Sequence, residues 1–230
     1  MSHPSADEPG LVEVIEPECF SEQALQSVFQ LNRALVELLV RSASRPGVEA
    51  PPQIVVSLGP ALLALGAAAR ERIARCPTAL ADFGFRNLEF WRQIESGHTV
   101  LPSLPACFPR PQAIQLAQTT LTLAWTLWHS NREAAVIVFG LSPECAATLA
   151  RIGVQAIPHI SEVYAHCVRP RWETDITFWR ELIRVARSID SPVQPRLPAI
   201  GVYAMQRQLA DLISLSLATR ETAATRANQR

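Results

Sequence analysis

Apolar residues recur every three or four positions along most of this chain, a spacing that predicts amphipathic helices. The first such stretch begins after Ser21, whose hydroxyl is suited to cap a helix N-terminus, and Glu22 follows in the first turn. Its apolar face consists of Leu25, Val28, Leu31, Leu35, Leu38 and Leu39. The proline-rich residues 44–53 then interrupt the pattern.

Further helices are predicted from the same periodicity and from start and stop signals. Gly59 and Pro60 are interpreted as the start of a helix that runs to about Ala74, and Ser142, Pro143 and Glu144 as the cap and first turn of another. The other predicted helices cover residues 87–94, 112–130, 175–187 and 199–218. Because no segment alternates at a period of two, the predicted fold class is all-α.

Proline content divides the chain. Four prolines within residues 96–111 are typical of a linker. The predicted organisation is a lead segment (residues 1–20), a helical unit (21–95), the linker (96–111), a second helical unit (112–190), and a C-terminal helix (191–220) with a tail to residue 230.

Three matches between the two halves indicate an internal repeat. Residues 54–60 (IVVSLGP) match residues 137–143 (IVFGLSP) at an offset of 83. Residues 90–94 (FWRQI) match residues 178–182 (FWREL) at an offset of 88, and Gly66 matches Gly153 at 87. A tandem duplication would pack as a pseudo-twofold pair within one chain. Chance similarity between alanine- and leucine-rich helices is the alternative.

Composition restricts the classes of function. The chain has 21 acidic and 21 basic residues, and every basic residue is an arginine, which excludes lysine chemistry. With no net charge, nucleic-acid binding must come from a local patch. The five widely spaced cysteines and the polar, acidic N-terminus favour the cytoplasm. The uncharged residues 111–131 contain threonines, glutamines and a histidine, so a buried helix is favoured over a membrane span.

Catalytic motifs are absent from the sequence. It contains no G-x-S-x-G, no H-E-x-x-H and no glycine-rich phosphate loop, and its five histidines are scattered. No cluster has the spacing of metal ligands. We therefore expect neither an enzyme nor a cofactor or metal.

One cluster has the chemistry of a phosphate contact. His166, Arg169, Arg171 and Trp172, with Arg180 beyond them, could bind DNA phosphates and stack on bases. A solvated loop around a buried tryptophan is the alternative. Residues 142–163 also fit a helix-turn-helix with its turn at Gly153.

Residues 131–172 resemble the FlhD-type flagellar regulators, which are all-α dimeric transcription factors. The resemblance rests on REAA (residues 132–135), FGL (139–141), ATLA (147–150) and CVRPRW (167–172). It implies an FlhC-like partner, activation of promoters, and control of flagellar genes or of the transfer genes of mobile elements. It also implies that Cys167 lies near a subunit interface, where an intermolecular disulfide could form. A small, buried, apolar thiol is the alternative and is favoured in a reducing cytoplasm.

The predicted function is therefore that of an FlhD-like activator subunit that binds promoter DNA with an FlhC-like partner and no membrane. Homo-oligomer formation is a further expectation, and the helical seam of Leu121, Trp125 and Trp128 is the predicted protein interface. The alternative is a helical adaptor, or a secretion-system assembly protein, that does not bind DNA.

Overall fold

The computed structural model describes residues 21–45, 50–97 and 105–188, and within them it confirms the all-α class. The first half contains α1 (Glu22–Ser44), α2 (Gln53–Leu63), α3 (Ala67–Ala74), β1 (Ala81–Asp82) and α4 (Leu88–Glu95). The second half contains α5 (Arg110–Ser130), α6 (Arg132–Phe139), α7 (Pro143–Arg151), η1 (Val154–Ala156), α8 (Ile157–Val163), η2 (Ala165–Cys167), β2 (Arg169–Pro170) and α9 (Ile176–Ser188). The predicted lead and C-terminal helix lie outside the described residues.

Side-chain caps set several helix starts. The Ser21 hydroxyl accepts a hydrogen bond from the Ala24 amide, and the Ser142 hydroxyl accepts one from Cys145. These two predicted caps are confirmed. Asn87 caps α4 in the same way, by accepting from the Phe90 amide.

The predicted helix start at Gly59 and Pro60 is wrong. Both residues lie inside α2, which begins at Gln53 after Pro52. Pro60 has no N–H for the carbonyl four residues earlier, that of Val56. Val56 lies on the solvent side of α2 and is 63% exposed, so water can satisfy this carbonyl.

Part of the predicted linker is packed. Cys107 and Phe108 are buried, and α5 begins at Arg110 and so includes the last two residues of the predicted linker. Residues 98–104 lie outside the described residues. The linker prediction therefore failed at its C-terminal end, where two residues join the core.

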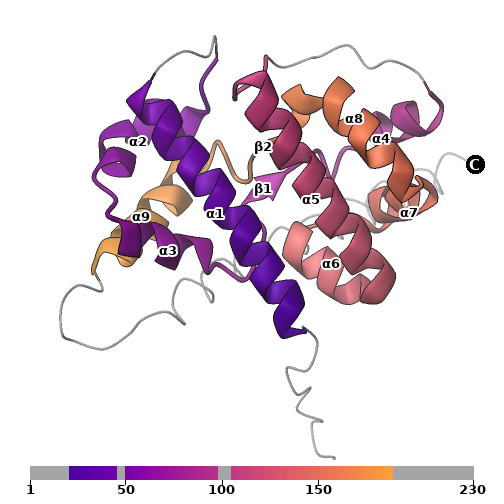
Figure 1. The fold of residues 1–230 in the computed structure, drawn as a ribbon, viewed down its shortest axis with the longest axis horizontal. Helices are drawn as coiled ribbons and strands as arrows, with labels where there is room; N and C mark the ends of the chain where they lie inside the picture. Colours follow the sequence, from indigo (N-terminus) through magenta and orange to yellow (C-terminus); the bar gives the residue numbers. More distant parts are fainter. Residues whose placement is uncertain (1–20, 46–49, 98–104, 189–230) are drawn as a thin grey trace, which may run out of the picture.

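The helices surround a central pair, α1 and α5. Figure 1 shows α2, α3 and α9 together on one side of this pair, and α4, α7 and α8 on the other. The last described helix of each half packs on helices of the other half: α9 lies against α2 and α3, whereas α4 lies against α7. A single buried cluster runs through both sides, so the described residues share one core.

The segments that lead to α4 and α9 contain β1 and β2, which meet at the centre of the structure (Figure 1). β1 and β2 form a two-residue antiparallel bridge in which Ala81 pairs with Pro170 and Asp82 with Arg169. The Arg171 amide extends the bridge by donating to the Leu80 carbonyl at 2.6 Å. Strands of two residues are too short to show a period of two, which is why the sequence did not predict them.

Asn32 fixes the segment that leads into β1. Its side chain is fully buried in α1. The amide nitrogen donates to the carbonyls of Cys76 (2.9 Å) and Thr78 (3.0 Å), and the amide oxygen accepts from the Leu80 amide (2.8 Å). Three backbone groups without other secondary structure are thus satisfied by one side chain.

Two tryptophans anchor the helices that cross. Trp91 in α4 and Trp179 in α9 are 0% and 1% exposed. The Trp91 indole donates to the Gly84 carbonyl at 2.9 Å, and the Trp179 indole donates to the Arg171 carbonyl at 3.0 Å. Each ring therefore ties its helix to the chain segment just before it.

Replacing either tryptophan by alanine should lower the free energy of unfolding by about 3–5 kcal/mol, because a large buried side chain and its hydrogen bond are lost together. Chemical denaturation measures this change. Val56→Ala is the control and should change stability by less than about 0.5 kcal/mol, since Val56 is largely exposed. Equal midpoints for the tryptophan variants and wild type would contradict the anchoring role.

Candidate nucleic-acid interface

Arg171 is turned into the protein, so the prediction that it binds phosphate is wrong. Arg171 is only 5% exposed, and its guanidinium donates to the Val138 carbonyl at 3.0 Å. The guanidinium also lies 4.5 Å from the centre of the Trp172 ring, which packs on Phe178. Strand β2 causes this orientation, because the backbone of Arg171 is bonded to Leu80.

Arg169 is held by the protein itself. Its guanidinium makes two bonds to Glu173, at 2.6 and 3.0 Å, and a third to the Pro105 carbonyl. The Glu173 carboxylate also accepts from the Gln53 amide at the start of α2. Hydrogen bonding to Glu173 raises the pKa of Arg169. Arg169 is thus paired within the protein, and its contact with phosphate stays a prediction.

His166 and Trp172 have structural surroundings as well. His166 is half-buried near the Tyr164 ring, and burial lowers the pKa of its imidazole, so the ring is neutral at pH 7. Trp172 adopts a φ of 51°, which few residues other than glycine adopt. Packing on Phe178 and Arg171 holds it there. Neither side chain presents a positive charge to solvent.

The predicted interface seam faces the chain's own helices. Leu121 is fully buried, so it contacts no partner. The indole of Trp125 donates to the Ile152 carbonyl at 3.0 Å, and the guanidinium of Arg132 lies 5.4 Å from the Trp128 ring centre. Trp125 and Trp128 are half-buried, and their exposed edges are all that the seam offers to another protein.

Cys167 is half-buried, and Cys107 is fully buried. Burial raises the pKa of Cys167 to about 11 and that of Cys107 to about 12. The Cys107 thiol donates to the Val168 carbonyl at 3.4 Å. Both thiols are therefore protonated at neutral pH. The expected interface role of Cys167 stays a prediction.

Alkylation of Cys167 by iodoacetamide at pH 8 should be about a hundredfold slower in the native protein than in denaturant, where the pKa returns to near 9.0. The thiolate reacts, and its fraction falls about tenfold per unit of raised pKa. The rate should increase as pH rises towards 11. Peptide mass spectrometry separates Cys167 from the other cysteines, and equal native and denatured rates would contradict the buried thiol.

Helix α9 carries exposed positive charge, unlike residues 166–172. Its buried face consists of Phe178, Trp179, Leu182, Ile183 and Ala186. Arg180, Arg184 and Arg187 follow one another at the four- and three-residue spacing that places side chains on one helix face. Arg180 is a predicted DNA contact, and its solvent exposure is compatible with that role. The same spacing could have identified Arg184 and Arg187 from the sequence.

These arginines border a shallow groove between α9 and α2, which we call the α9 groove. Its open volume is about 470 Å³. The lining residues are Ala61, Arg180, Glu181, Ile183, Arg184, Arg187 and Ser188. Arg184 pairs with Glu181 at 2.7 Å, whereas no ion pair of Arg180 or Arg187 is found within the described ranges. Three guanidinium groups thus face one carboxylate, over an apolar floor.

The region predicted as a helix-turn-helix contains two short helices, α7 and α8, joined through η1. Gly153 precedes η1, and Pro158 occupies the first turn of α8, where proline is tolerated. His159, Glu162 and Val163 are the exposed residues nearest the end of α8. One carboxylate and no arginine on α8 make it a poorer phosphate-binding surface than α9.

Comparisons with known proteins found no similarity: no protein-family model matches, and neither does a curated protein or a solved structure. In the described part of the chain, no three histidine, cysteine or acidic side chains are grouped to bind a metal ion. No single described helix has the length and apolar character to cross a membrane; α6 and α7 together do, but they are bent by 115°.

Substitution of Arg171 should lower the stability of the protein, whereas substitution of Arg180 should not. Arg171→Met should destabilise the protein by about 1–3 kcal/mol, because the buried, charge-assisted hydrogen bond to the Val138 carbonyl is lost and only the Ala79 amide still donates to that oxygen. Arg180→Ala should change the free energy of unfolding by less than about 0.5 kcal/mol, since Arg180 is exposed. Denaturation midpoints compare the two. A stable Arg171→Met variant would mean that the guanidinium is not needed in the core.

Proposed function

We propose that the chain is an FlhD-like transcriptional activator subunit that contacts promoter DNA through the α9 groove and acts with an FlhC-like partner. Control of flagellar genes, or of the transfer genes of mobile elements, is the corresponding role. The observation that carries the proposal is the set of three guanidinium groups on the exposed face of α9. Arginine is the side chain best suited to phosphate, because its planar fork binds two oxygens.

The proposed architecture is a pair of FlhD-like units that exchange their last helices. Its support is a set of equivalent positions 88 residues apart. Gly84 and Trp172 both have positive φ values. Asn87 and Asp175 each accept a hydrogen bond from the amide three residues later, in front of the two FWR segments.

The bridge between β1 and β2 supports the same pairing. Residues 81 and 82 correspond to residues 169 and 170 at this offset, and each strand residue pairs with the equivalent of its neighbour. A half-turn about the bridge in Figure 1 brings α9 onto α4, α2 onto α7 and α3 onto α8. An antiparallel bridge on the axis is the pairing that a twofold arrangement requires.

The match at an offset of 83 does not belong to this repeat. Residues 54–60 lie inside α2, whereas residues 137–143 span the end of α6, Gly140 and the start of α7. Gly66 and Gly153 are better guides, because they precede α3 and η1 respectively with nearly the same backbone angles. In the proposed repeat α6 has no counterpart and is an addition to the second unit.

A protein partner is part of the proposal for an electrostatic reason. The chain has no net charge, so its long-range attraction to DNA is weak. Three phosphate contacts from α9 provide positioning but no sequence readout. The FlhC-like partner that the resemblance implies would supply further contacts and the reading of bases.

Salt-dependent DNA binding tests the proposal. The protein, purified with any partner from its native host, is titrated with promoter fragments recovered from the same complex, between about 50 and 200 mM salt. Replacing Arg180, Arg184 and Arg187 by alanine should reduce the slope of log K against log[salt] by about 0.9 for each phosphate that is no longer neutralised, up to about 2.7.

The matched control removes three arginines from other surfaces: Arg33, Arg75 and Arg151, each exposed and paired with a carboxylate. It changes the net charge equally but should leave the slope within about one unit of wild type. Equal reductions in both variants would mean that charge alone matters. Absence of DNA binding in the wild-type complex would overturn the proposal.

A helical adaptor without DNA binding is the second candidate, and one observation favours it. Val56 and Leu63 on α2 are 63% and 49% exposed, which is unusual for large apolar residues of one helix. In that case Val56→Ser and Leu63→Ser should abolish recovery of the partner. The arginine variant should then leave partner recovery unchanged.

A further inference from the structure

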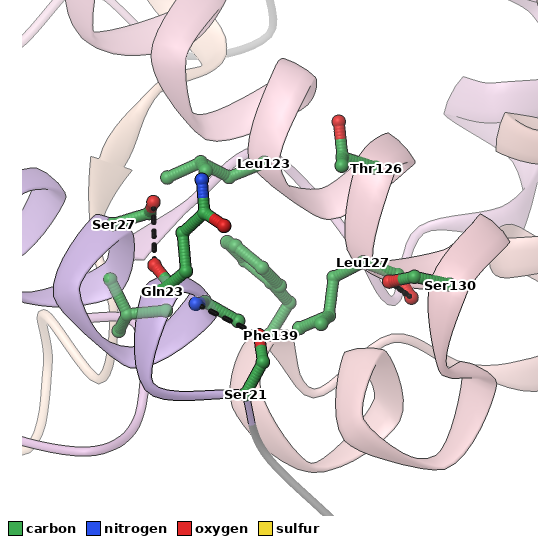
Figure 2. A pocket seen from close by; sticks show the side chains of 10 residues that line it. Ser21, Gln23, Ser27, Leu123, Thr126, Leu127, Ser130 and Phe139 are labelled. Atoms are coloured by element: carbon green, nitrogen blue, oxygen red, sulfur yellow. Dashed lines mark hydrogen bonds between the residues drawn. The ribbon is translucent and has the colours of Figure 1, made fainter.

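A cavity of about 260 Å³ lies where the start of α1 meets the end of α5. We call it the α1–α5 cavity, and Figure 2 shows it from close by. Its lining residues are Ser21, Gln23, Ala24, Ser27, Val28, Leu123, Thr126, Leu127, Ser130 and Phe139. Three helices contribute to it, because Phe139 is the last residue of α6.

The floor of the α1–α5 cavity is apolar and deeply buried. Phe139 is 1% exposed, Val28 2% and Leu127 8%. The Phe139 ring packs edge-on against Phe85, with ring centres 5.6 Å apart. A ligand with an apolar body could therefore be received by a preformed surface.

The described residues of the rim are polar and carry no charge. The hydroxyls of Ser27 and Ser130 donate to carbonyls of their own helices, and their lone pairs remain available. The side chains of Gln23 and Thr126, from opposite walls, form no hydrogen bond that the described residues show. A carboxamide and a hydroxyl can both donate and accept, so they fit a neutral polar group.

The charge of the ligand follows from this lining. Among the residues that the structure describes, no ionisable side chain lines the cavity, so an ion would lose hydration without gaining a partner there. The positive end of α1 does not compensate an anion, because Ser21 caps the helix and Glu22 lies in its first turn. The size of the cavity, just below the range of about 300–1,000 Å³ for drug-sized ligands, indicates a small molecule.

We propose that the α1–α5 cavity binds a small uncharged amphiphile: a single ring or short chain against Phe139, with an amide or hydroxyl between Gln23 and Thr126. The proposal is independent of DNA binding. Phe139 of α6 is part of the cavity wall, and α6 has no counterpart in the proposed repeat, so a single site per chain is expected.

Benzamide and benzoate test this site, because they share a ring and a size but differ in charge. Chemical-shift titration of the full chain should show saturable binding of one benzamide, in the millimolar range or tighter. Benzoate should bind at least about tenfold more weakly. No saturable benzamide binding, or equal binding of the two compounds, would overturn the proposal whatever the variants show.

Two cavity-filling variants locate the site. Ala24→Leu and Thr126→Leu fill it from opposite walls, and each should abolish benzamide binding. Gln26→Leu on α1 and Gln118→Leu on α5 add the same side chain outside the cavity and should bind as wild type does. Circular dichroism identifies a filling variant that fails to fold. The other filling variant then tests whether benzamide binds in the cavity. Retained binding in a folded filling variant would place benzamide elsewhere and overturn the proposal.

Discussion

The fold depends on the antiparallel bridge between β1 and β2, because both segments that lead to a crossing helix pass through it. Only four residues form the bridge, so its stability comes from the groups around it. Asn32 satisfies the backbone before β1, while the Arg171 backbone extends the pairing from β2 and its side chain bonds Val138. A buried polar network of this kind is costly when one partner is missing, so it specifies a single arrangement.

This constraint explains why the arginines of the second half have different roles. Arg169 and Arg171 lie in and beside β2, where the backbone is paired and the side chains satisfy buried carbonyls and Glu173. Arg180 lies past the crossing, on a helix whose apolar face is already buried, and its charge therefore faces solvent. Arginines before α9 thus stabilise the packing of the protein, whereas the arginine on α9 belongs to a candidate interface.

Local signals in the sequence predicted the helices well where a cap and a periodic face agree. Ser21 and Ser142 cap as expected, and α5 and α9 lie within two residues of their predicted bounds. The helix start predicted at Pro60 was wrong, because a proline can lie within a helix when water can reach the carbonyl that it leaves unpaired. The burial of Arg171 was not predictable, since it depends on Leu80 and Val138, which are distant in the sequence. The α1–α5 cavity was equally hidden, because its walls come from helix ends about 100 residues apart.

The crossing of α4 and α9 also determines what would happen if the chain were divided between residues 97 and 105. Each fragment would lack a helix that packs on its own helices: α2 and α3 would lose α9, and α7 would lose α4. Each piece would expose an apolar surface that only the other piece fits. The two fragments should therefore associate with each other, because each supplies a helix that packs on the helices of the other.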